Sequence, residues 1–149
     1  MPRPVIPNPN PSKTTALLLR LLAHLTAPAP AQATAPASPA SPAWAPGSIH
    51  LFGFAQGATA AGELALAWNK AHPSTPLGSV VSVSGPLLSH PTAPAKAAGT
   101  KVLLAMRRRE SREMGAASWG KAFGGVKEVV WERGEGMPRG AEEWREVMR

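Results

Sequence analysis

The chain contains no cysteine and no aspartate. Without cysteine it can form no disulfide, has no thiol nucleophile and offers no thiolate to a metal ion. All nine acidic residues are glutamates, and the first of them is Glu63. The four histidines, at positions 24, 50, 72 and 90, show none of the spacings that are typical of metal ligands. We therefore expect no metal and no other cofactor.

The formal charge of +7 raises the question of nucleic-acid binding. The densest basic patch is Arg107-Arg108-Arg109 with Arg112. No aromatic residue is interleaved with these arginines to stack on bases, and no helix-turn-helix, zinc-finger or RNA-recognition signature is present. We therefore expect no nucleic-acid partner, and we interpret residues 107–112 as a solvated basic loop.

Composition divides the chain into four parts. Residues 1–12 form a Pro/Asn segment that ends in Ser12, a candidate N-cap. Residues 13–26 are Leu-rich with Arg20 and His24 four residues apart, which predicts an amphipathic helix. Residues 27–46 are an Ala/Pro/Ser low-complexity insertion, which favours a disordered, flexible or polyproline-like segment. The remaining residues, 47–149, are expected to form the folded domain.

The basic, acid-free start of the chain also resembles a targeting signal. The apolar run from Ala16 to Leu25 and the small residues Ala31-Gln32-Ala33 have the layout of a signal peptide, although Arg20 interrupts the run. We expect a cytoplasmic protein, with mitochondrial or secretory targeting as the alternative. No apolar stretch has the length of a membrane span, so no transmembrane segment is expected.

From residue 49 onward the pattern alternates between strands and helices. Strands are predicted at 49–53, 78–84, 101–106 and 126–131, and helices at 57–71, 114–123 and from Pro138 to Met148, with a loop at 85–99. The strands are apolar runs, as in parallel sheets that are covered on both faces. The expected fold class is α/β, a partial three-layer sandwich with a mainly parallel sheet of about four strands. Such a sheet is thin, so the architecture looks incomplete at its start.

One motif joins the first of these strands to the next helix. Gly53-Phe54-Ala55-Gln56-Gly57 follows the strand-like residues Ile49 to Phe52 and precedes the helical run from Ala58 to Trp68. In G-x-S-x-G motifs of hydrolases the two glycines permit a sharp turn that lifts the central side chain above the sheet. Here the central residue is Ala55, and a methyl group can neither attack a carbonyl nor be activated by a base.

This motif, together with Ser82-Val83-Ser84-Gly85 after the next strand, resembles the α/β-hydrolase fold. The specific similarity is to the phospholipase/carboxylesterase group that includes acyl-protein thioesterases, over roughly residues 48–149 and more weakly the helix at 13–26. The resemblance implies a serine hydrolase with an acyl or ester small molecule as its ligand. It places the nucleophile at Ala55 and one oxyanion-hole donor at the backbone N–H of Gln56.

The other family positions are also changed. The resemblance places the catalytic acid within Arg107 to Glu113, where only Glu110 or Glu113 could substitute for aspartate. It places the catalytic histidine within Glu132 to Met137, which contains no histidine. We therefore expect a degenerate, truncated and non-catalytic member of the family, because triad members act as a unit.

Three other residues are alternative catalytic candidates. Thr59 lies one helical turn beyond Ala55, although a helical threonine more often bonds its own backbone. Ser84 and His90 flank a Pro-containing loop at the end of a strand, where α/β sheets place their sites. His50 shares a strand face with Phe52 and is expected to be packed and hydrogen-bonded.

Two further hypotheses stand beside the non-catalytic family member. One is a working ester or thioester hydrolase that uses unrecognised residues or a partner chain. The other is a binding module that holds an acyl or acidic ligand over Ala55 and Gln56 or at the basic residues 107–112.

Overall fold

A computed structural model describes residues 10–27, 43–89, 97–114, 116–132, 134 and 136–148, with only the backbone at 97–98 and 113–114. The first nine residues, residues 28–42 of the Ala/Pro/Ser insertion and His90 lie outside the described residues. The targeting prediction for Ala31-Gln32-Ala33 falls there as well.

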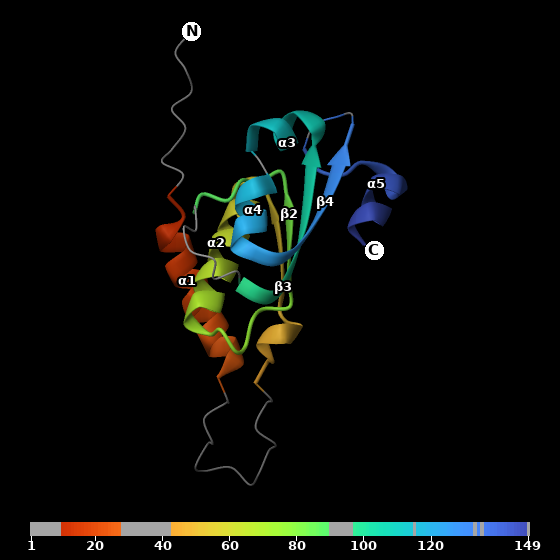
Figure 1. Cartoon of the computed structure of the whole chain (residues 1–149). Coiled ribbons are helices and arrows are strands. Elements are labelled where there is room, and N and C mark those ends of the chain that lie inside the picture. The colour runs from red at the N-terminus through yellow and green to blue at the C-terminus, as the bar shows by residue number, and fades with distance from the viewer. Residues whose placement is uncertain are drawn as a thin grey trace, which may run out of the picture.

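The described residues form a four-stranded sheet in the order β1-β2-β3-β4, and all neighbouring strands are parallel (Figure 1). The strands are β1 (His50–Phe54), β2 (Ser79–Val83), β3 (Ala97–Arg107) and β4 (Phe123–Trp131). The helices are α1 (Ser12–Thr26), α2 (Gln56–Ala71), α3 (Arg108–Met114), α4 (Ala116–Ala122) and α5 (Gly140–Val147), with a short 3-10 turn at Pro46–Ser48. The predicted fold class, a partial α/β sandwich with a parallel sheet, is confirmed.

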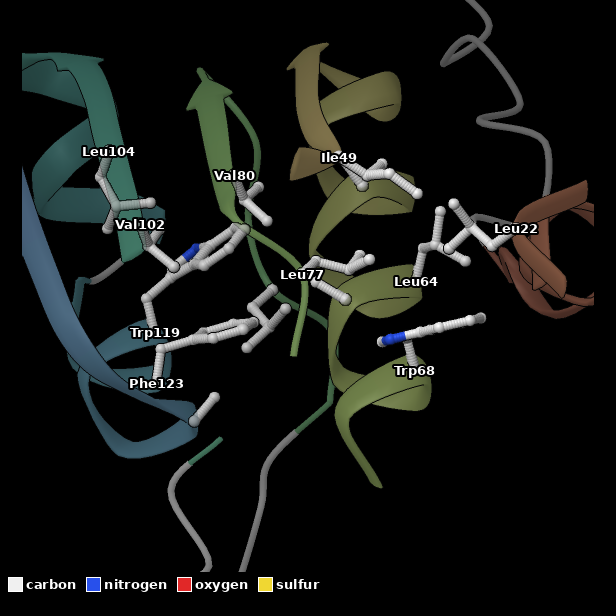
Figure 2. Packing of buried hydrophobic residues seen from close by; sticks show 14 of the residues in the cluster. Leu22, Ile49, Leu64, Trp68, Leu77, Val80, Val102, Leu104, Trp119 and Phe123 are labelled. Atoms are coloured by element: carbon white, nitrogen blue, oxygen red, sulfur yellow. The ribbon is translucent and has the colours of Figure 1, made fainter. Parts of the chain in front are cut away.

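Helices α1, α2 and α4 lie on one side of the sheet, and α5 lies on the other (Figure 1). The larger core fills the first side, where aromatic side chains from α2 and α4 pack against apolar residues of the strands (Figure 2). Its labelled members are Leu22, Ile49, Leu64, Trp68, Leu77, Val80, Val102, Leu104, Trp119 and Phe123. Leu22 belongs to this core, so α1 is packed onto the α/β unit.

Alternating side chains of the strands supply both cores. On β3, Val102 and Leu104 face the larger core, whereas Ala105 faces a smaller core with Val83 and Val129. Successive strand residues point to opposite faces of a sheet, so two covered faces require a continuous apolar run. This requirement explains the successive apolar residues Val80-Val81 in β2 and Val102 to Met106 in β3.

Strand β1 stands at the edge of the described sheet and is less covered on the α5 side. Phe52 is 53% exposed and Phe54 is 42% exposed. Phe52 stacks on Trp144 of α5, with ring centroids 6.3 Å apart. The α5 side of β1 therefore presents aromatic surface next to the turn that follows Phe54.

The register aligns the carboxyl ends of three strands. Phe54 pairs with Val83, and Val83 pairs with Ala105. The residues that follow β1 and β2, Ala55 and Ser84, therefore lie side by side at one edge of the sheet. Ligand sites of α/β sheets form at this edge.

Several predicted boundaries were wrong for identifiable reasons. Residues 108–114 form helix α3 rather than a basic loop, because the Glu110 carboxylate accepts the N–H of Arg107 and caps the helix start. Strand β3 already begins at Ala97, inside the predicted loop 85–99.

The helix boundaries also differ from the predicted ones. The predicted helix at 114–123 corresponds to α4, Ala116–Ala122, but Met114 is the last residue of α3 and Phe123 already begins β4. Helix α5 begins at Gly140 instead of Pro138, after an extended Arg139. Ser12 is a helical residue of α1, and its backbone N–H donates to the Asn10 side chain. No described helix combines the length and apolar character needed to cross a bilayer.

Candidate functional site

The turn between β1 and α2 consists of a single residue, Ala55. Its backbone has φ 51° and ψ −117°, which lies near the first central position of a type II′ turn, a position usually held by glycine. A non-glycine residue in such a conformation costs about 1–3 kcal/mol of local strain. The sequence motif therefore folds into a strained strand-to-helix turn with the Ala55 methyl group at its centre.

Close packing between the strand and the helix requires one glycine of the motif. A Cβ atom on Gly53 would lie 2.3 Å from the carbonyl oxygen of Gly57 and 2.5 Å from the Ala58 nitrogen. A Cβ atom on Gly57 would meet no heavy atom within 4 Å apart from its chain neighbours and the backbone of its own helix. Steric crowding therefore requires glycine at position 53, whereas Gly57 is sterically free.

The helix begins immediately after the strained residue. The carbonyl oxygen of Ala55 accepts hydrogen bonds from the backbone N–H groups of Ala58 and Thr59, at 3.0 and 3.2 Å. Gln56, the candidate oxyanion-hole residue, is the first residue of α2, and its side chain is exposed. The backbone N–H groups of Gln56 and Gly57 precede these bonds at the start of α2, and N–H groups at a helix start favour a negative charge.

The end of β2 packs against this turn. Ser84 has φ 54° and donates its backbone N–H to the Ala105 carbonyl at 2.9 Å. A Cβ atom on Gly85 would lie 2.3 Å from the Ala58 side chain and 2.8 Å from the Ala55 oxygen. The pair Ser84-Gly85 is thus part of the same site, and only glycine fits at position 85.

Glu110 occupies the region where the resemblance places the catalytic acid. Its Oε2 atom accepts the Ser84 hydroxyl at 2.7 Å and the backbone N–H of Arg107 at 3.0 Å. The carboxylate therefore links the end of β2 to the start of α3. The side chain of Glu113, the other substitute for the acid, lies outside the described residues.

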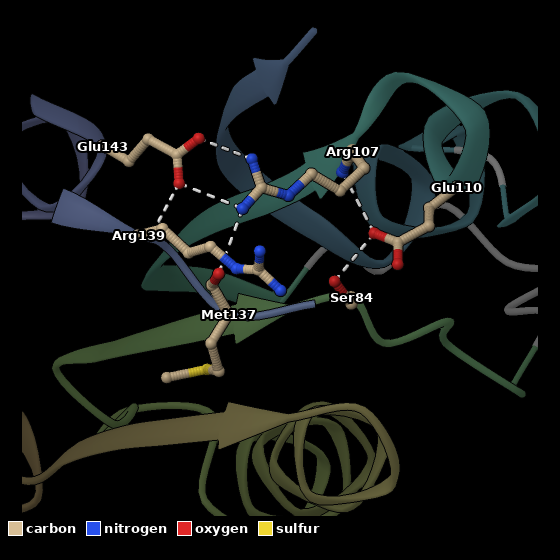
Figure 3. A network of polar contacts seen from close by, with 6 residues as sticks. All are labelled: Ser84, Arg107, Glu110, Met137, Arg139 and Glu143. Atoms are coloured by element: carbon tan, nitrogen blue, oxygen red, sulfur yellow. Dashed lines mark hydrogen bonds and ion pairs between the residues drawn. The ribbon is translucent and has the colours of Figure 1, made fainter. Parts of the chain in front are cut away.

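Arg107 is the centre of a polar network that fastens the segment before α5 (Figure 3). Its guanidinium donates to Glu143 through Nη1 at 2.6 Å and Nη2 at 3.0 Å, and Nη2 also donates to the carbonyl oxygen of Met137 at 3.0 Å. The guanidinium carbon lies 4.7 Å from the centre of the Trp131 ring. Because a buried charge must be paired, these contacts offset the burial of an arginine that is only 3% exposed.

The Glu143 carboxylate also holds the segment before α5 at Arg139. Glu143 accepts the backbone N–H of Arg139 at 2.6 Å. The hydrogen bonds from Arg107 and Arg139 lower the pKa of the Glu143 carboxyl below its ordinary value. Residues 137–139 are therefore tied to the end of β3 through one ion pair.

This segment brings the expected histidine region next to the turn at Ala55. A Cβ atom on Gly136 would lie 3.6 Å from the Phe54 ring, and Phe54 directly precedes Ala55. Gly136 itself has φ 69°. The described residues of 132–137 contain no imidazole, and positions 133 and 135 lie outside the described residues.

The alternative catalytic candidates Thr59, His50 and Ser84 each have a hydrogen-bond partner. The Thr59 hydroxyl donates to the Pro86 carbonyl at 2.8 Å, so the expectation that it bonds its own backbone was wrong. His50 hydrogen-bonds the Ser79 hydroxyl at 2.8 Å, at the opposite end of the strands, and is exposed rather than packed. Ser84 bonds Glu110, and its predicted partner His90 lies outside the described residues.

Of the basic residues that the sequence predicted to be solvated, Arg108, Arg109 and Arg112 are exposed, on helix α3, but Arg107 is not. Arg107 is buried in the network described above. Exposed Arg108 pairs with exposed Glu132, which lowers the pKa of the Glu132 carboxyl and raises that of the Arg108 guanidinium. The buried arginine was missed because a three-residue basic run at the end of a strand carries no signal for which member turns inward.

One curated relative matches this chain. A protein of Mycosarcoma maydis named as an uncharacterized hydrolase is 34% identical over 150 residues, which is 97% of this chain and 51% of that protein. The chain thus spans about half the length of the curated relative that it matches. No protein-family profile matches the chain, and no solved structure matches it.

Proposed function

We propose that this chain is a hydrolase-type domain of the carboxylesterase and acyl-thioesterase kind that has lost the nucleophile of its elbow. Its turn at Ala55 binds an acyl or ester ligand without forming an acyl-enzyme there. The observation that carries the proposal is the backbone of Ala55, with φ 51° and ψ −117° between a parallel strand and a helix. The name of the Mycosarcoma maydis relative supports a hydrolase-type domain.

The strain at Ala55 supports a ligand-related origin for the turn. A plain connection between a strand and a helix does not need an alanine in a glycine-like conformation, and such strain clusters at active sites and ligand clamps. The first turn of α2 would place backbone N–H groups near a ligand carbonyl oxygen, as an oxyanion hole requires. The exposed ring of Phe54 beside the turn offers apolar surface to an acyl group.

Three changes support the loss of elbow catalysis. A methyl group stands at position 55, the described residues of 132–137 supply no imidazole, and Glu110 bonds Ser84 and Arg107. An acidic ligand held by residues 107–112 has less support, because Arg107 and Arg108 are paired with Glu143 and Glu132. An acyl or ester ligand at the turn of Ala55 is therefore better supported than an acidic ligand at residues 107–112.

The elbow can be tested by restoring its hydroxyl. We expect Ala55→Ser, made together with Ser84→Ala, to react slowly with a fluorophosphonate probe at position 55, as mapped by peptide mass. Enzymes stripped of their triad retain about a 10³-fold acceleration from the oxyanion hole and binding. The matched control is Ala60→Ser in the same background, which adds a hydroxyl to α2 outside the strained turn and should not react.

Ligand binding is tested separately on the native chain. Titration calorimetry with a series of simple methyl esters of increasing acyl length should detect binding to the native protein. The proposal is wrong if a cooperatively folding Ala55→Ser variant stays unlabelled and no ester in the series binds.

A further inference from the structure

Two strained residues lie side by side at the carboxyl edge of the sheet. Ala55, at φ 51°, and Ser84, at φ 54°, are the non-glycine residues with positive φ in the described part of the chain. They directly follow Phe54 and Val83, which are paired in the parallel register of β1 and β2. Neighbouring strands are about 4.8 Å apart. Ser84 therefore presents a hydroxyl group one strand away from the alanine of the elbow.

The Ser84 hydroxyl has the immediate surroundings of an activated nucleophile. It donates to Oε2 of Glu110 at 2.7 Å (Figure 3), and Ser84 is 8% exposed. A nucleophilic hydroxyl needs a base within about 2.6–3.2 Å that is itself oriented by a third group. The backbone N–H of Arg107, which donates to the same carboxylate oxygen at 3.0 Å, is that orienting group.

Another serine–glutamate pair in the chain lacks this setting. The Ser111 hydroxyl donates to Glu128 at 2.9 Å, but the contact is exposed and joins helix α3 to strand β4. Ser111 has no strained backbone and does not adjoin the turn at Ala55. Ser89 and Glu63 form a third pair, which is also exposed, although backbone N–H groups hold that carboxylate as well. Among these three pairs, Ser84 is the serine that directly follows a strand at the edge where α/β sheets place their sites.

We infer that Ser84 is a second nucleophile of this domain, with Glu110 as its base, and that it accepts an acyl group from activated esters. This inference goes beyond the proposed function, in which the elbow only binds the ligand. In the first step Oγ of Ser84 forms a bond to the ester carbonyl carbon while its proton passes to the Glu110 carboxylate. The bond from that carbon to the alkoxy oxygen then breaks, and the leaving alkoxide takes the proton from Glu110.

The products of this step are an acylated Ser84 and a free alcohol. Water then attacks the same carbonyl carbon and gives its proton to Glu110, which returns it to Oγ as the carbon–oxygen bond to Ser84 breaks. The carboxylic acid is released and the hydroxyl is restored. Because a carboxylate is a weaker base than an imidazole, esters with good leaving groups are the expected acyl donors.

The test is fluorophosphonate labelling of the native chain, followed by peptide mapping. We expect one label per chain, on Ser84, with loss of fluoride from the probe. Ser84→Ala should abolish the label, and Glu110→Gln should slow it about 100-fold, which is the size of a general-base contribution. The amide oxygen of the glutamine variant can still accept from Ser84 and Arg107, so its fold is preserved, and a matched melting curve checks this.

Ser111→Ala is the control and should leave the labelling rate unchanged. The inference is overturned by an unlabelled native chain, by a label mapped to any other residue, or by labelling of Ser84 at the same rate in Glu110→Gln. The label is mapped on the native chain itself. The inference can therefore be overturned even if one of the variants fails to fold. The test of the proposed function follows labelling at position 55 in a Ser84→Ala background, where Ser84 cannot react. The two proposals can therefore fail independently.

Discussion

The carbonyl oxygen of Gly57 lies 2.3 Å from the position that a Cβ atom would take on Gly53. This contact brings the first turn of α2 against the last residues of β1 and makes the strand-to-helix turn as short as one residue. The two glycines of the motif are therefore not equivalent, although they look alike in the sequence.

The first prediction uses this difference. Gly53→Ala should destabilise the fold by about 2–3 kcal/mol, because backbone atoms must move to admit the methyl group. Gly57→Ala, the matched control on the same turn, should stabilise it by about 0.5–1 kcal/mol, since alanine favours a helix and its Cβ meets open space. Urea unfolding of both variants measures the difference, and equal losses would contradict the close approach of α2 to β1 at Gly53.

The second prediction concerns the strain at Ala55. Ala55→Gly should raise the free energy of unfolding by roughly 1 kcal/mol, because glycine adopts φ 51° without a Cβ clash. The gain is less than the full strain, since glycine also increases the entropy of the unfolded chain. Thermal unfolding measures it. A lower melting temperature for Ala55→Gly would mean that the turn is not strained.

A third prediction compares two ion pairs. Glu143→Gln should cost about 2 kcal/mol, because it leaves the buried Arg107 guanidinium without its counter-charge. Glu132→Gln breaks the exposed pair with Arg108 and should leave the free energy of unfolding nearly unchanged, because water screens that pair. Denaturant unfolding of the two variants is the measurement, and similar effects would show that Arg107 is not held as described.

The fourth prediction concerns acid. Hydrogen bonds from Arg107 and Arg139 lower the pKa of Glu143 in the folded state. As pH falls, the unfolded state therefore binds more protons than the folded state. The Glu143 carboxylate contributes fully to the free energy of unfolding near neutral pH and loses this contribution below about pH 5. Stability of the native chain between pH 7 and about pH 3 should fall more steeply than that of Glu143→Gln. Parallel slopes for the two proteins would refute the assigned shift.

Local pattern was enough to predict much of this fold. The runs at 78–84, 101–106 and 126–131 predicted β2, β3 and β4. In β3 the residues from Val102 to Met106 are apolar at successive positions, as a strand covered on both faces requires. Strand β4 is more exposed, with Lys127 and Glu128 at the surface. The helix boundaries near Arg108 and Gly140 were missed, because a side chain from within each helix, Glu110 or Glu143, fixes the start through a backbone N–H.

The sequence by itself determined which groups are present: an alanine at the centre of the elbow motif, no cysteine, no aspartate and no histidine between residues 132 and 137. Only the tertiary structure decided which groups meet. Ser84 and Glu110 are 26 residues apart in the chain, and Arg107 and Glu143 are 36 apart. Their contacts arise because parallel strands end at one edge of the sheet. The type of a residue does not reveal which residue it will contact across that edge.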